Sequence, residues 1–142
     1  MLANTGINIV PLLEMLGNTI TVISDTVTQT YQYSDNNNPD NKLKGIVYAP
    51  NLETVESRSI DDNSGMTTII MPKVKTIKSQ GFWASYGLKT VFIPNACTSL
   101  ATNAFSMCGN LTNIYIDNVE GTFGDIAADS SLPNLKVTYL KK

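Results

Sequence analysis

Histidine is absent from this sequence of 142 residues, and cysteine occurs only twice. Without histidine, the chain lacks the commonest general base and the usual partner of a nucleophilic serine or cysteine. A structural zinc site usually takes three or four cysteine or histidine ligands, which this chain does not offer. Two cysteines are also too few for a disulfide scaffold. These absences predict a protein that is not an enzyme and that holds no metal or cofactor.

Charged residues are scarce as well. They make up 15% of the chain, the net charge is −2, and Arg58 is the only arginine. This composition predicts no electrostatic surface for nucleic acid. No apolar run approaches the roughly 20 residues that span a bilayer, so membrane insertion is not expected. The apolar stretch at the N-terminus has no positive charge before it and is interrupted by Pro11, which is not the pattern of a secretory signal.

The sequence does contain a repeat of about 22 residues. Apolar residues recur at the first, fourth and sixth positions of five short segments, which start 23, 22, 23 and 21 residues apart. The fourth and sixth positions of such a segment point the same way on a β-strand. The segments are Leu43–Tyr48, Met66–Met71, Leu88–Ile93, Leu111–Ile116 and Leu132–Val137.

The agreement extends beyond these segments. In three consecutive units a proline follows the segment, then a second apolar pair, then a bulky residue and a glycine. The prolines are Pro50, Pro72 and Pro94, and the bulky residues are Ile60, Phe82 and Phe105. Proline stops a strand, and glycine is typical of a turn, so the units share a structure as well as a composition.

One unit of this length cannot bury its own apolar side, but stacked units bury one another's. We therefore expect a mainly β solenoid of four to five coils over residues 43–142, with parallel strands about 4.8 Å apart. The second apolar pair of each unit should form a short strand on the opposite wall. The segment Asn103–Cys108 should form a single helical turn.

The best-preserved units resemble a known family. Gly87–Pro94, Asn103–Phe105 and Cys108–Ile116 are similar to the BspA-like class of leucine-rich repeats, with its order of aromatic residue, cysteine, Asn-Leu, strand and Ile-Pro. The resemblance covers residues 43 to 140, although Ile60 replaces the aromatic residue and Asn63 the cysteine in the first unit. It implies a binding scaffold similar to surface proteins that contact host proteins or cells, and it brings no catalytic residue.

Residues 1–42 do not fit the repeat and are expected to form a separate N-terminal segment. Pro11–Leu16, followed by Gly17, predicts a short helix. Thr19–Ile23 and Thr26–Tyr33 predict two strands, with a hairpin turn between them at Ser24 and Asp25. Ser34–Lys42 predicts a loop. The segment either caps the first coil or serves as an attachment or oligomerisation element.

The strand register predicts an outward row of apolar side chains. The fifth position of each segment lies between two inward positions, so it should face outward. A contiguous apolar patch on the outside of a protein favours a partner, a second copy or cover by the chain's own N-terminal segment. The row is Val47, Ile70, Phe92 and Tyr115, followed by Lys136, and the polar residues Thr68, Thr90 and Asn113 run beside it.

Other residues were weighed for chemistry. Trp83 and Tyr86 beside Phe82 are either core residues or a second contact surface, with the core favoured for Trp83. Cys97 and Cys108 fall at core positions, which favours buried free thiols over a disulfide. Asp61 and Asp62 are expected to be solvated in a turn. Four acidic residues in the last unit could gather around calcium, although their spacing is not that of a calcium loop; they are Asp117, Glu120, Asp125 and Asp129.

The expected function is therefore recognition, by a binding module for a protein or glycan in adhesion at a cell surface. The alternative is a structural or host-recognition component of a larger assembly, such as a phage virion or a surface fibre. The expected partners are a protein or glycan on another surface, or other copies of the chain. The expected location is the extracellular surface or a virion.

Overall fold

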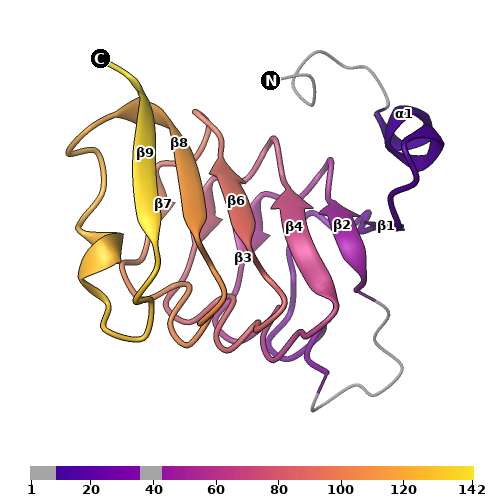
Figure 1. Cartoon of the computed structure of the whole chain (residues 1–142), viewed down its shortest axis with the longest axis horizontal. Coiled ribbons are helices and arrows are strands. Elements are labelled where there is room, and N and C mark those ends of the chain that lie inside the picture. Colours follow the sequence, from indigo (N-terminus) through magenta and orange to yellow (C-terminus); the bar gives the residue numbers. More distant parts are fainter. Residues whose placement is uncertain (1–8, 36–42) are drawn as a thin grey trace.

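The computed structural model describes residues 9–35 and 43–142, and it forms a parallel β-solenoid. Six strands make the front sheet in the order β1-β2-β4-β6-β8-β9, and every neighbouring pair is parallel. Figure 1 shows them side by side along the length of the molecule. They are β1 (Ile20–Val22), β2 (Gly45–Tyr48), β4 (Met66–Ile70), β6 (Thr90–Ile93), β8 (Asn113–Val119) and β9 (Lys136–Lys141).

A second sheet of three short parallel strands forms the opposite wall. Its strands are β3 (Thr54–Val55), β5 (Thr76–Ile77) and β7 (Ser99–Leu100), which confirms the predicted role of the second apolar pair. The chain reaches this wall after the prolines, since β2, β4 and β6 each end one or two residues before one. Each coil therefore contributes one strand to each wall, as the repeat predicts.

The core lies between the two walls and runs through every coil. Ile69, Val91 and Ile114 are fully buried at equivalent places in adjacent strands, which confirms the predicted inward register. Phe82 and Phe105 stack in the same core with their ring centroids 5.1 Å apart. Aromatic pairs in this offset arrangement add to the stability that burial itself supplies. Neighbouring coils thus close each other's apolar sides.

The turns that carry these aromatic residues are not helical, so the prediction for Asn103–Cys108 is wrong. The amides of Ser106 and Cys108 each donate to the carbonyl three residues earlier, but Met107 between them has a positive φ of 66°. A left-handed residue cannot continue a right-handed helix. Only the last coil has a short helix here, the 3-10 turn η2 (Ile126–Ala128).

The cysteine position of the repeat links one coil to the one before it. Asn63 donates from its side chain to the carbonyl of Tyr33 at 2.8 Å, and Ser85 donates to that of Ile60 at 2.8 Å. The Cys108 thiol donates in the same way to the carbonyl of Phe82, 3.0 Å away. The three side chains differ in chemistry, but each satisfies one buried carbonyl, as buried polar groups require.

The solenoid begins earlier than residue 43. Strand β1 pairs in parallel with β2, Val27 bridges Thr54 on the opposite wall, and the amide of Tyr33 donates to the carbonyl of Ser59 at 2.8 Å. The predicted hairpin is therefore wrong: residues 20–35 run around the stack as one coil, and only the first predicted strand forms. The strand pairing crosses the predicted division between residues 42 and 43. Most of the predicted loop lies outside the described residues.

The predicted N-terminal helix is confirmed as α1 (Val10–Met15), which ends before Gly17 with its positive φ of 84°. Figure 1 shows α1 beyond β1, at the opposite end of the molecule from β9. None of its residues is buried. Among the described residues, no helix is long and apolar enough to cross a membrane.

Candidate functional site

The outer face of the front sheet carries a row of large apolar side chains. The pairing places Tyr48 beside Ile70, and Phe92 beside Tyr115, at equivalent outward positions. In β1 the same position is held by Val22, which pairs with Tyr48 and is half exposed. We call Tyr48, Ile70, Phe92 and Tyr115 the front row.

Val47 does not belong to this row, and its prediction as an outward residue is wrong. It pairs with Ile69 and is fully buried. The cause is an irregularity between Gly45 and Ile46, where the register with β4 shifts by one residue. A slip of one residue moves every side chain to the other face of a strand. Tyr48 therefore takes the outward place that the sequence assigns to Val47, although only 8% of it is exposed.

The last strand is shifted too, but by two residues. Lys136 pairs with Asn113 rather than with Tyr115, whose partner is Thr138. A shift of two preserves the face of each side chain, so Lys136 still points outward. The row therefore continues from Tyr115 to Thr138, and Lys136 extends the polar line beside it.

Phe92 and Tyr115 form the centre of the front row. Their rings stack with centroids 5.3 Å apart and planes inclined by 19°. This separation follows from the spacing of neighbouring strands, about 4.8 Å. Each ring covers part of the other, so both are partly buried without any element above them. The pair presents a flat, rigid aromatic surface.

Thr68, Thr90 and Asn113 lie in adjacent strands and pair with one another, beside the front row, as predicted. All three are partly exposed. The Asn113 side chain donates to the hydroxyl of Thr112 at 3.2 Å. Ile46 extends this line on β2, where it pairs with Thr68. The arrangement sets hydrogen-bonding groups along one margin of an apolar strip.

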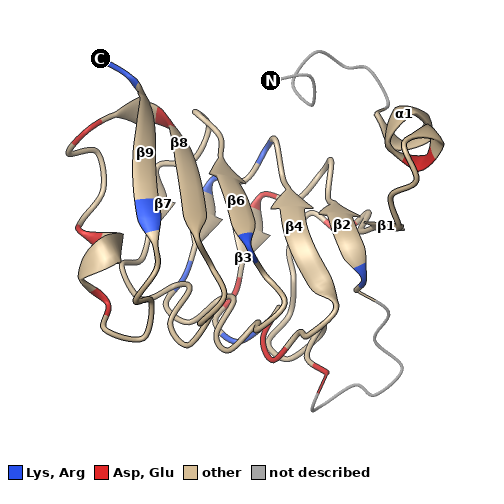
Figure 2. Ribbon diagram, viewed as in Figure 1, with Lys and Arg blue, Asp and Glu red and all other residues tan. Residues whose placement is uncertain are grey.

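No described segment crosses the outer face of the front sheet (Figure 1). Of the two candidates for internal cover, the coil 20–35 extends the sheet edge and α1 lies beyond it. The strands of this sheet also carry few charges, as Figure 2 shows. Lys136 is the charged residue in the polar line, and the front row has none. The described chain therefore leaves this apolar strip accessible.

Trp83 and Tyr86 lie on the turn side of the solenoid. Trp83 is partly exposed and does not join the core, contrary to the reading that was favoured. The guanidinium of Arg58 sits 4.1 Å from the centre of the Trp83 ring and 5.8 Å from that of Tyr31. Tyr86 is about half exposed. The two predicted residues thus lie at the surface, but Arg58 occupies one face of the indole.

Asp61 is fully buried, so the prediction of a solvated carboxylate is wrong. Its Oδ2 accepts from Nε of Arg58 in an ion pair, while the Nη2 of Arg58 lies 3.7 Å from Asp62. Its other oxygen, Oδ1, has no hydrogen-bond partner among the described residues. A buried carboxylate needs a paired cation, so this arginine is structural as well as exposed to the aromatic rings.

Both cysteines are free and buried, as predicted. Burial raises the pKa of the Cys97 thiol to about 11 and that of Cys108 to about 12. Since the thiolate is the nucleophile and the metal ligand, neither group is suited to covalent chemistry at neutral pH. The two thiols serve as small apolar core groups.

The acidic residues of the last coil do not gather, so the calcium alternative is wrong for the described chain. Asp117 pairs with Lys141 at 3.6 Å, and Asp129 accepts hydrogen bonds from Ser106 and Ser131. Burial raises the pKa of Asp129, but these hydrogen bonds outweigh it and lower the pKa below its usual value. Within residues 9–35 and 43–142, no three His, Cys, Asp or Glu side chains are grouped to hold a metal ion.

Sequence reasoning missed two features of these surfaces. Tyr48 is hidden by the register shift, for which Gly45, with its positive φ of 64°, is the available signal. The contact between Arg58 and Trp83 joins residues one coil apart. The spacing of about 22 residues would have placed position 61 next to position 83, and this was the signal to use.

Comparison with known proteins agrees with the geometry. The family described as BspA type leucine rich repeat region matches residues 19–139 in six copies. The match starts at the coil that contains β1, where the strand pairing also starts. No curated protein and no solved structure matches the chain. Leucine-rich repeats of this kind are in general non-catalytic scaffolds for binding or adhesion. The chain belongs to the BspA-type leucine-rich repeat family.

Proposed function

We propose that this protein recognises a protein partner through the outer face of its front sheet. The observation that carries the proposal is the stacked pair Phe92 and Tyr115, which stands on a sheet face that no described segment covers. Rigid aromatic side chains are the commonest anchors of protein interfaces, since they bury a large area at a low cost in conformational entropy. The adjoining threonines and Asn113 supply the polar margin that such interfaces have.

A protein partner is favoured over a glycan by the shape and charge of the face. Small-ligand sites are concave, with a few convergent polar groups. The front row is instead a flat strip along the sheet, and it carries no carboxylate to bind sugar hydroxyls. Adhesion at a cell surface is the setting in which a scaffold of this family, without catalytic groups, would act.

The test is a binding comparison between the full chain and two variants. Labelled protein is applied to printed arrays of purified extracellular-matrix proteins and to printed glycan arrays. We expect the wild type to bind specific protein spots and the double variant Phe92→Ser/Tyr115→Ser to lose at least tenfold in affinity for them. Thr76→Ala, on the outer face of the opposite wall, is the matched control and should bind like the wild type.

Two results would contradict the proposal. Binding restricted to glycan spots would exclude the proposed class of partner. Equal binding by the wild type and the folded double variant would exclude the proposed face. Urea unfolding of each variant, followed by circular dichroism, shows whether the double variant keeps its fold.

A structural component of a larger assembly, such as a phage virion or a surface fibre, is the second candidate. One observation favours it: α1 is apolar, yet none of its residues is buried. An exposed apolar element of this kind is typical of an interaction site. Mass spectrometry of purified virions or fibres that contain the chain in stoichiometric amounts would support this candidate over free adhesion.

A further inference from the structure

The two ends of the solenoid carry unpartnered apolar features that match each other. At one end, α1 exposes Leu12, Met15 and Leu16, of which Met15 is 83% and Leu16 70% exposed. These residues are spaced i, i+3 and i+4, so they lie on one face of the helix. Glu14 is the only charged residue of α1. The helix therefore offers one apolar face with a single negative charge.

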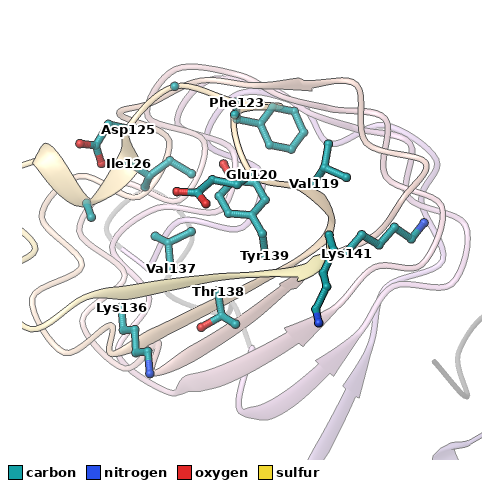
Figure 3. A pocket seen from close by; sticks show the side chains of 14 residues that line it. Val119, Glu120, Phe123, Asp125, Ile126, Lys136, Val137, Thr138, Tyr139 and Lys141 are labelled. Atoms are coloured by element: carbon teal, nitrogen blue, oxygen red, sulfur yellow. The ribbon is translucent and has the colours of Figure 1, made fainter.

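At the other end, the inner side of the last coil forms an open hollow of about 940 Å³. Figure 3 shows Val137 and Tyr139 on the side of β9 that faces Phe123 and Ile126, with Thr138 and Lys136 on the other side. In earlier coils the corresponding inward side chains are covered by the next coil. In the described chain nothing stacks on β9, which is the last strand of the front sheet.

The size of the hollow suits a short helix. A helix of six residues is about 9 Å long and about 10 Å wide, which as a cylinder is about 700 Å³. The charge of the hollow also suits α1, since three lysines and two acidic residues line it. They are Lys136, Lys141 and Lys142, with Glu120 and Asp125. The excess of positive charge favours an incoming segment whose one charge is negative.

One molecule cannot join these two features to each other. Figure 1 places α1 and β9 at opposite ends of the stack. We propose that α1 of one molecule docks in the terminal hollow of a second copy, so that molecules associate head to tail. Such a contact is heterologous, because it joins two different surfaces, and it can extend into open chains. It uses none of the front row, so it does not depend on the proposed recognition function.

The contact is small, so the association should be weak. Stable interfaces bury about 1,600 Å² in total, which a single six-residue helix cannot supply. We therefore expect the full chain to be monomeric at low micromolar concentration. Its weight-average mass should rise with concentration in sedimentation equilibrium up to about 0.5 mM.

Two single variants test the proposal, one for each surface. Leu16→Glu places a charge on the apolar face of α1, and Ala127→Trp fills the hollow from an exposed position. Each variant alone should stay monomeric over the concentration range in which the wild type associates, with at least a tenfold loss of affinity. Tyr86→Glu, an exposed aromatic residue on the turn side, is the control and should associate like the wild type.

Mixing the two variants gives the sharpest result. Each retains the surface that the other lacks, so an equimolar mixture should form a dimer and nothing larger. A mixture that stays monomeric would overturn the proposal, as would a wild type that is monomeric at 0.5 mM. Association that survives in both single variants would show a different interface and would overturn it too. Unfolding midpoints of all variants establish that each is folded, and Ala127→Trp tests the hollow even if Leu16→Glu alters α1.

Discussion

Arg58 is the residue whose loss should be felt most strongly outside the apolar core. It pairs with the fully buried carboxylate of Asp61, and its guanidinium also packs on the ring of Trp83. Removal of one partner of a buried ion pair leaves an uncompensated charge, which costs about 3 to 5 kcal/mol. We expect Arg58→Ala to lower the free energy of unfolding by about 3 kcal/mol, measured by urea denaturation.

An exposed ion pair provides the comparison. Lys75 and Glu53 are 2.6 Å apart, but both side chains are largely open to solvent. The Lys75 ammonium holds the pKa of Glu53 below its usual value. Exposed pairs contribute little because water and salt screen them. Lys75→Ala should therefore leave the urea midpoint almost unchanged. Equal effects of the two substitutions would show that Asp61 is not buried as described.

Cys108 predicts a specific dependence of stability on pH. Burial raises the pKa of its thiol from 9.0 to about 12 in the folded protein. A raised pKa stabilises the fold fully below pH 9, and this contribution is lost as the pH rises towards 12. Between these values the loss is about 1.4 kcal/mol for each pH unit.

Cys108→Ser isolates this effect. Serine can keep the hydrogen bond to the Phe82 carbonyl, as Ser85 does to Ile60 in the preceding coil. The difference in unfolding free energy between wild type and variant should be constant up to pH 8.5. It should then shift against the wild type as the pH rises to 10.5. A difference that does not change with pH would mean that the thiol is open to solvent.

At the scale of elements, the turns between coils differ in how tightly they pack. A Cβ at Gly87 would lie 2.3 Å from the carbonyl oxygen of Ser64 and 2.8 Å from that of Met66. Gly109, its equivalent in the next coil, has no atom within 4 Å of such a Cβ. Overpacking against backbone typically costs about 1 to 3 kcal/mol.

The matched pair Gly87→Ala and Gly109→Ala tests this difference. We expect Gly87→Ala to lower the free energy of unfolding by about 2 kcal/mol, because backbone must move. Gly109→Ala should be neutral or stabilise by about 0.4 to 1 kcal/mol, because alanine restricts only the unfolded chain there. Thermal unfolding monitored by circular dichroism distinguishes the two. A larger effect at Gly109 would contradict the packing of coil on coil at Gly87.

The central elements could be predicted from the sequence, and the outer ones only in part. Ile69, Val91 and Ile114 stand at equal spacings, so the periodicity alone places them in adjacent strands with the same orientation. Periodicity does not reveal an extra residue inside a strand. The irregularity at Gly45 therefore moved Val47 from the predicted outer face into the core.

The first coil was missed because its chemistry and its length differ from those of the others. Tyr33 stands at the aromatic position, and the bridge at Val27 replaces a full strand on the opposite wall. The interval from Tyr33 to Ile60 is also longer than the usual 22 residues, and its Asn-rich part reads as a loop. A strand-rich composition at Thr26–Tyr33 favoured a hairpin, although a tight turn of the solenoid uses the same residue types.

For the whole molecule, stacking of similar coils separates stability from recognition. Inward positions are filled by residues that any neighbouring coil can cover, whereas outward positions are free to differ from coil to coil. This freedom explains why the front row and the line beside it change from apolar at β2 to aromatic and polar at β6 and β8. It also explains why the two ends, each with only one neighbour, carry surfaces of their own.

The most direct test is an NMR measurement of which side chains touch between adjacent strands. In methyl-labelled protein we predict nuclear Overhauser contacts from Val47 to Ile69, and onward from Ile69 to Val91, as one core network. The Phe92 and Tyr115 rings should contact each other in a separate outer network. Contacts from Val47 to Phe92, or none between Ile69 and Val91, would contradict the stacked coils on which the account depends.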